Sequence, residues 1–107
     1  MKRYGFMIKI KPRKLEEYKK LHADVWSDVA KMITECNIRN YSIYHKDGFL
    51  FSYFEYIGKD FKEDMKSMAD DPITKKWWDI CKPMQIPLET REKDEWWANM
   101  EEVFHQD

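Results

Sequence analysis

A tyrosine and a histidine one helical turn apart are the residues of this sequence best suited to acid–base chemistry. Tyr18 and His22 lie four positions apart within LEEYKKLHADVWSDVAKMI, residues 15–33. On a helix this spacing puts both side chains on one face, so their polar ends can reach the same spot. Histidine has an ordinary pKa near 6.5 and can give and take protons at neutral pH. The pair indicates a general acid–base unit; the structural alternative is a core histidine hydrogen-bonded to a neighbouring carbonyl.

The helix predicted around this pair is amphipathic. At about 100° per residue its apolar side chains share a stripe roughly 120° wide, with His22 near the centre. The stripe consists of Leu15, Tyr18, Val25, Trp26, Val29, Met32 and Ile33. We expect one helix that starts at Pro12, which suits a first turn, and runs to about Cys36. Asn37 then suits a left-handed stop.

Two tryptophan pairs add flat apolar surfaces with polar edges. Aromatic residues make up 16% of the chain, and five of them are tryptophans. Neighbours on a helix project about 100° apart, so one member of Trp77-Trp78 can lie in the core while the other lines a pocket edge. Trp96-Trp97 falls on a predicted strand, where neighbours point to opposite faces. Packing is the plain interpretation of either pair, although such side chains also suit an oligomer interface or a sugar site.

The pattern of the whole chain predicts the element order β-α-β-β-α-β. Strands are expected at residues 3–11, 40–46, 49–57 and 95–105, with an Asp47-Gly48 hairpin between the second and third. A second helical region follows from Asp60, with a break before Pro72, and the segment from Pro83 to Lys93 is expected to be a loop. This order is that of the ferredoxin-like split motif, an α+β fold with an antiparallel four-stranded sheet and helices on one face. We expect one domain over residues 1–107.

Both faces of the strand at residues 49–57 are apolar. The two sets are Leu50, Phe54 and Tyr56 on one side, and Phe51, Tyr53 and Ile57 on the other. Helices cover one side of such a sheet, and a half-exposed antiparallel strand should show a polar face. The simplest cover for the other side is an identical subunit. We therefore expect a homodimer packed sheet to sheet.

Composition and charge argue against several classes of partner. The net charge is −1, with 19 basic and 20 acidic residues mixed along the chain, so no basic stripe points to nucleic acid. No apolar run reaches the roughly 18 residues of a membrane span. The N-terminal apolar stretch is too short for a signal peptide and is interrupted by lysines. Cys36 and Cys81 form no disulfide framework, so free thiols and a cytoplasmic location are expected.

Metal and cofactor chemistry have little support in the sequence. The three histidines, His22, His45 and His105, show no helical i, i+4 pairing, and no Cys/His cluster is present. The chain has three glycines in all and no glycine-rich phosphate loop. No nucleophile elbow appears. We expect neither a metal nor a cofactor.

Five short segments together resemble one known family. They are EEYKKLHADVW, RNYSIY, LFSYFE, DPITKKWW and the terminal MEEVFH, and they span nearly the whole chain. Each is weak alone, but the combination resembles the L-rhamnose mutarotase family. The resemblance implies a small homodimer with a dimeric α+β barrel fold. It also implies a cofactor-independent isomerase that interconverts the α and β anomers of L-rhamnose or a related 6-deoxy hexose such as L-fucose.

The resemblance also implies roles for particular residues. The catalytic proton donor of the family matches His22, and its sugar-binding residues match Tyr18, Tyr41, Trp77 and Trp78. No role carries over to the second tryptophan pair, which is left as structural. The stretch KPMQIPLETREKDEWWANM departs from the family pattern, so the mouth of a sugar pocket can differ here.

The residues suit mutarotation independently of the resemblance. One group protonates the ring oxygen of the hemiacetal while another takes the anomeric hydroxyl proton, and the aldehyde then rotates before the ring closes. General acid–base help of this kind is worth about 10²–10⁴-fold. Two alternatives stay open at this point. One is a haem- or quinol-handling monooxygenase, because the same dimeric fold hosts that chemistry; the other is a catalytically silent sugar-binding module.

Overall fold

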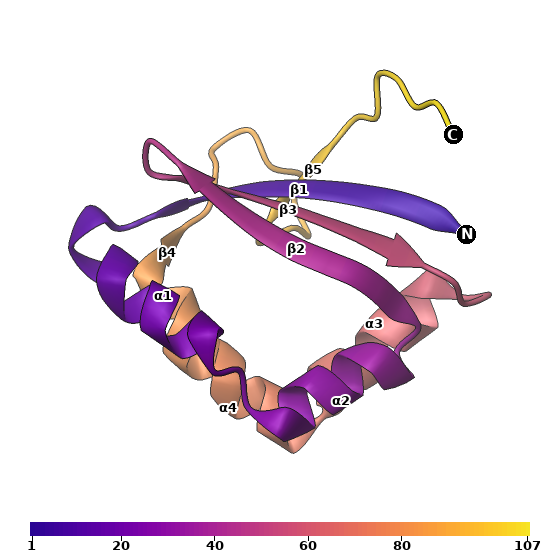
Figure 1. Ribbon diagram of the computed structural model, residues 1–107, viewed down its shortest axis with the longest axis horizontal. Coiled ribbons are helices and arrows are strands. Elements are labelled where there is room, and N and C mark those ends of the chain that lie inside the picture. Colours follow the sequence, from indigo (N-terminus) through magenta and orange to yellow (C-terminus); the bar gives the residue numbers. More distant parts are fainter.

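A curved antiparallel sheet with all helices on one of its faces is the framework of the protein (Figure 1). The computed structural model describes residues 1–107. The strands are β1 (Lys2–Ile10), β2 (Ile38–Lys46), β3 (Phe49–Tyr56), β4 (Gln85–Ile86) and β5 (Ala98–Met100). The helices are α1 (Leu15–Ala23), α2 (Ser27–Glu35), α3 (Phe61–Asp70) and α4 (Pro72–Cys81), with short 3-10 turns at Pro12–Lys14 and Lys82–Met84. The strand order is β2-β3-β1-β4, so the expected βαββαβ arrangement is confirmed.

Two short segments share the fourth position of the sheet. Strand β4 pairs with the end of β1 at Lys9 and Ile10, whereas β5 pairs with its middle at residues 5–7. The predicted strand at residues 95–105 was therefore too long, because only residues 98–100 pair with β1. The predicted loop from Pro83 was also wrong at its start, since it contains β4. Proline at position 87 lacks a backbone N–H and cannot extend that strand further.

The hairpin between β2 and β3 forms as its sequence predicts. Asp47 and Gly48 have φ angles of 51° and 83°, and positive φ at both positions is what a type I′ turn requires. The register of β2 against β3 shifts between Arg39 and Ser42, and Asn40 within this bulge has φ 52°. A bulge inserts extra backbone and re-aims the neighbouring side chain. Here that neighbour is Tyr41.

The single helix predicted from Pro12 to Cys36 is wrong in the middle. The chain leaves helical geometry at Asp24 (φ −143°, ψ 65°) and at Trp26 (φ −55°, ψ 133°), and α1 and α2 meet at an angle (Figure 1). Both Val25 and Trp26 pack against the main core cluster, which the bend allows. The other helix boundaries are confirmed: Asn37 has φ 67°, and α3 ends before Pro72.

The core lies between the helices and the inner face of the sheet. Its main cluster consists of Ile8, Ile10, Tyr18, Val29, Leu50, Trp77, Cys81 and Met84. A second cluster consists of Cys36, Ile38, Phe54 and Met68. The helix side of β3 is buried, whereas the outer side of this strand is half-exposed. No helix combines the length and the apolar character that crossing a bilayer demands.

Candidate active site

The imidazole ring of His22 is held by the backbone of its own helix. Its Nδ1 atom lies 2.8 Å from the carbonyl oxygen of Tyr18. A carbonyl oxygen only accepts hydrogen bonds, so the neutral ring carries its proton on Nδ1 and donates it there. Every fully buried side-chain nitrogen or oxygen atom in the structure has a hydrogen-bond partner. Nε2 of His22 has no such partner, so this atom is not fully buried and is accessible. His22 thus presents an unprotonated nitrogen.

Aromatic rings surround this imidazole. The Tyr18 ring stacks on it with centroids 4.1 Å apart, and Trp77 meets it edge-on at 5.2 Å. Trp26 in turn packs edge-on against Trp77 at 5.1 Å. Burial lowers the pKa of His22 below its ordinary 6.5, and the hydrogen bond to the Tyr18 carbonyl opposes this only in part. The ring is therefore neutral at pH 7 and able to accept a proton.

The hydroxyl group of Tyr18 belongs to a buried hydrogen-bonded chain. Tyr18 is 4% exposed, and its oxygen lies 3.1 Å from Nε2 of Gln85. Oε1 of Gln85 lies 2.8 Å from Nε1 of Trp96. Burial raises the pKa of Tyr18 and the bond from Gln85 opposes that rise, so the phenol is neutral at physiological pH. Sequence patterns gave no signal for Gln85, which lies in the segment expected to be a loop.

Tyr41 reaches the same region from the sheet. Its ring meets Phe54 edge-on with centroids 5.5 Å apart, which places it on the helix side of β2. The residue is 41% exposed, yet burial raises the pKa of its hydroxyl to about 12, with Cys81 as a further cause. The ring therefore packs against Phe54 while much of the side chain stays open at the edge strand.

The two neighbouring tryptophans of α4 have different surroundings. Trp77 is 6% exposed and belongs to the main core cluster. Trp78 is partly buried between both clusters, and the Lys82 ammonium lies 5.2 Å from its ring and 5.6 Å from that of Trp96. The structure therefore brings Trp77 into contact with His22 and leaves Trp78 beside Lys82. Both members of the pair at residues 96–97 pack against the main cluster.

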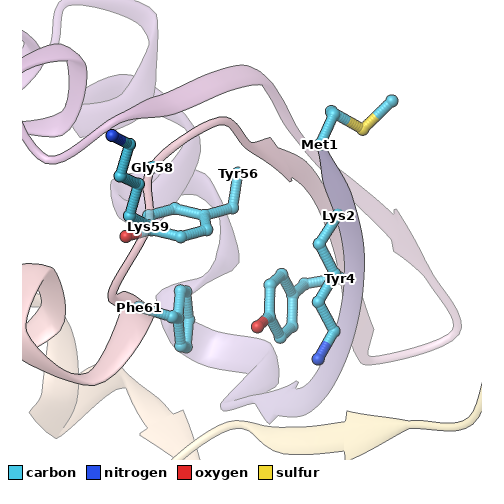
Figure 2. A pocket seen from close by; sticks show the side chains of 7 residues that line it. All are labelled: Met1, Lys2, Tyr4, Tyr56, Gly58, Lys59 and Phe61. Carbon is cyan, nitrogen blue, oxygen red and sulfur yellow. The ribbon is translucent and has the colours of Figure 1, made fainter.

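Two surface hollows lie away from His22. One, of about 330 Å³, lies beside α3 at the end of the sheet (Figure 2). It is lined by Met1, Lys2, Tyr4, Tyr56, Gly58, Lys59 and Phe61. The other, of about 260 Å³, lies between α2 and the start of α4. Neither contains an acid–base pair like that of Tyr18 and His22. No group of three or more His, Cys, Asp or Glu side chains is placed to hold a metal ion.

The topology, the helices on one face and the curved sheet define the dimeric α+β barrel class of fold. Two solved structures share it over the whole of this chain, each with a TM-score of 0.76. One is an L-rhamnose mutarotase from Formosa agariphila, 22% identical and covered over 100% of its length. The other is tetracenomycin F2 cyclase from Streptomyces glaucescens, a polyketide cyclase, 12% identical and covered over 98%. At these identities the likeness establishes the fold alone.

Sequence comparison defines the family within this class. The model of the L-rhamnose mutarotase family matches residues 3–106. L-rhamnose mutarotases from Oceanobacillus iheyensis and Phocaeicola vulgatus are 33% and 34% identical, each covering all of both chains. The chain belongs to the L-rhamnose mutarotase family and is an isomerase of the kind that interconverts sugar anomers.

Proposed function

We propose that this protein interconverts the α and β anomers of L-rhamnose, or of a related 6-deoxy hexose such as L-fucose, without a cofactor. The observation that carries the proposal is the state of His22. Its Nδ1 is tied to the Tyr18 carbonyl, its Nε2 is accessible and unpaired, and burial keeps the ring neutral. A residue in this state can accept a proton near neutral pH and return it in the next step.

The reaction requires two proton transfers at the hemiacetal. The neutral Nε2 of His22 takes the proton of the anomeric hydroxyl, the bond between the anomeric carbon and the ring oxygen breaks, and the ring oxygen takes a proton from a second acid. The resulting aldehyde rotates and the ring closes on its other face, with the proton transfers reversed. No electrons pass to another molecule, and no covalent link to the protein is needed. Tyr18, neutral and adjacent, is the candidate partner at the sugar oxygen.

The sugar itself needs a flat apolar surface next to these groups. Tryptophan rings suit the C–H face of a sugar, and the methyl group of a 6-deoxy sugar adds an apolar contact. We assign this role to Trp77 and Trp78, with Tyr41 as a further hydrogen-bonding residue. Support comes from the ring contact between Trp77 and His22 and from the packing of the Tyr41 ring on Phe54, on the helix side of β2.

A homodimer packed sheet to sheet is part of the proposal. All helices lie on one side of the sheet, and the opposite face is uncovered (Figure 1). That face carries the half-exposed aromatic side chains of Phe51 and Tyr53, and Tyr44 beside them is 66% exposed, although Arg3 and Glu55 also lie on it. Burying such a surface against its own copy removes apolar area from water. A cytoplasmic location also stays a prediction, which the free cysteines Cys36 and Cys81 support.

Saturation-transfer NMR across a panel of 6-deoxy sugars tests the function directly, because it measures α/β exchange at equilibrium. Acceleration above the buffer rate for L-rhamnose or L-fucose is the expected result. Binding of a sugar with exchange at the buffer rate would instead indicate a silent sugar-binding module. A Soret band on addition of haem would favour the monooxygenase alternative, which shares the fold class but needs a different site.

A further inference from the structure

Three side chains from distant parts of the chain form one hydrogen-bonded line. Nε1 of Trp96 lies 2.8 Å from Oε1 of Gln85, and Nε2 of Gln85 lies 3.1 Å from the hydroxyl oxygen of Tyr18. Gln85 is 7% exposed and Tyr18 is 4% exposed, so water does not compete freely for these bonds. The line ends beside the His22 ring, which stacks on Tyr18.

The chemistry of the three groups fixes the direction of every bond in the line. An indole N–H only donates, so the atom of Gln85 that faces Trp96 must be its carbonyl oxygen. The amide nitrogen therefore faces Tyr18, and it also only donates. The Tyr18 oxygen must accept this bond. Its own proton is then directed elsewhere, and no protein group in the structure accepts it.

We propose that Gln85 and Trp96 are positioning residues that hold the Tyr18 hydroxyl as a hydrogen-bond donor toward an oxygen atom of the bound sugar. This inference rests on the proposed function and deepens it. Without the line, the Tyr18 proton can turn inward and the hydroxyl can present a lone pair instead. With the line, the lone pair on the inner side is occupied and the proton is directed outward, so the hydroxyl is held as a donor. An oxygen that develops negative charge as the sugar ring opens is the acceptor such a donor suits.

The fold holds the line in place from both ends. Gln85 lies in β4, where it pairs with Ile10, and the neighbouring carbonyl of Met84 accepts a bond of 2.9 Å from the Lys11 N–H. Trp96 packs against the main core cluster, and the Lys82 ammonium lies 5.6 Å from its ring. Donors fixed in this way need no reorganisation when the substrate binds.

Gln85→Glu tests the direction of the bonds with almost no change of shape. An ionised carboxylate only accepts, so it takes the proton of Tyr18 and leaves the sugar without its donor. We expect anomer exchange to fall about tenfold or more against wild type, as for a lost polar contact. The introduced carboxyl is buried and should titrate above its ordinary pKa of about 4.3. Once protonated it can donate to Tyr18 again, so the ratio of variant to wild-type exchange should rise as the pH falls.

The ratio of variant to wild-type exchange rates is the quantity to compare, because it divides out the loss of rate that protonation of His22 causes in both proteins. Gln85→Met removes both bonds at similar volume and should reduce exchange by a factor that does not depend on pH. A flat ratio for Gln85→Glu across this pH range would overturn the proposal. Equal activity of Gln85→Glu and wild type at pH 8 would overturn it as well.

A second readout separates this proposal from the proposed function. The indole N–H resonance of Trp96, assigned with Trp96→Phe, should shift with the titration of the introduced carboxyl in Gln85→Glu, with no sugar present. An unaffected resonance overturns the hydrogen-bonded line. If the wild-type protein accelerates anomer exchange for no sugar in the panel, the proposed function is refuted, and so is the role of Tyr18 as a donor to the sugar. The Trp96 resonance would still show whether the hydrogen-bonded line exists.

Discussion

Nδ1 of His22 lies 2.8 Å from the backbone carbonyl oxygen of Tyr18, one helical turn earlier in α1. This bond assigns the ring proton to Nδ1 and leaves Nε2 without one. It is also the bond that a purely structural histidine would make with its neighbour. A purely structural histidine would not need an accessible, unpaired Nε2. Variants of His22 can therefore distinguish the catalytic role from the structural one.

The first prediction concerns His22→Asn. Asparagine keeps polarity and much of the volume but cannot transfer a proton near neutral pH, so exchange should fall by about 10²-fold or more. Sugar binding, followed by ligand-observed NMR, should persist. His22→Ala is the less informative change, because a cavity among the aromatic rings can cost a few kcal/mol of stability. Exchange at the wild-type rate in His22→Asn would leave His22 as a packed core residue.

The second prediction concerns pH. Burial lowers the pKa of His22 below 6.5 in the folded protein, so the neutral ring is the main form above that value. Exchange should be level above pH 6.5 and should fall as the pH drops through the lowered pKa. The unfolded chain binds this proton more tightly, so His22 also makes folding stability decrease as the pH falls from 6.5 toward the folded pKa. Thermal unfolding of wild type and His22→Asn at several pH values measures the difference in stability, which should change with pH inside this window and stay constant above it.

The third prediction separates the two tryptophans of α4. Trp77 is 6% exposed and contacts both His22 and Trp26, so Trp77→Phe should lower the free energy of unfolding by roughly 1–2 kcal/mol and weaken sugar binding as well. Trp78 is only partly buried, so Trp78→Phe should affect sugar affinity with little loss of stability. Chemical denaturation and sugar titration on each variant give the two quantities. Equal stability loss in both variants would contradict the difference in burial.

The fourth prediction concerns the dimer. Phe51→Glu places a negative charge on the uncovered face of the sheet, where a second copy would bring another like it. Sedimentation at micromolar concentration should show a dimer for wild type and a shift to monomer for this variant. Ser67→Glu makes the same change of charge at an exposed position of α3 and should stay dimeric. A wild-type monomer at that concentration would contradict the proposed assembly.

The fifth prediction concerns metal removal. A chelator followed by gel filtration should leave the exchange rate unchanged, because the proposed steps use only imidazole and phenol groups. Loss of activity that one particular divalent ion restores would show that a metal ion takes part.

Local sequence patterns were sufficient for the outline of the fold. The alternation in β1, the positive-φ turn at Asp47-Gly48 and the stop at Asn37 each depend on a few neighbouring residues, and all three appear as predicted. The helical stripe also put Tyr18 and His22 on one face, since residues four apart are neighbours on any helix. The same stripe did not predict the break at Asp24, because that bend is set by what Val25 and Trp26 pack against.

The sequence by itself thus determined the class of fold, the inward face of α1 and the adjacency of its Tyr–His pair. Only the tertiary structure decided that Trp77 and not Trp78 meets the histidine, that two short strands share the edge of the sheet, and that Gln85 bonds to Tyr18. Tyr18 and Gln85 are 67 residues apart, and neither carries a local signal for the other. Periodicity and turn chemistry act over a few residues, whereas such a contact exists only when the whole core has packed.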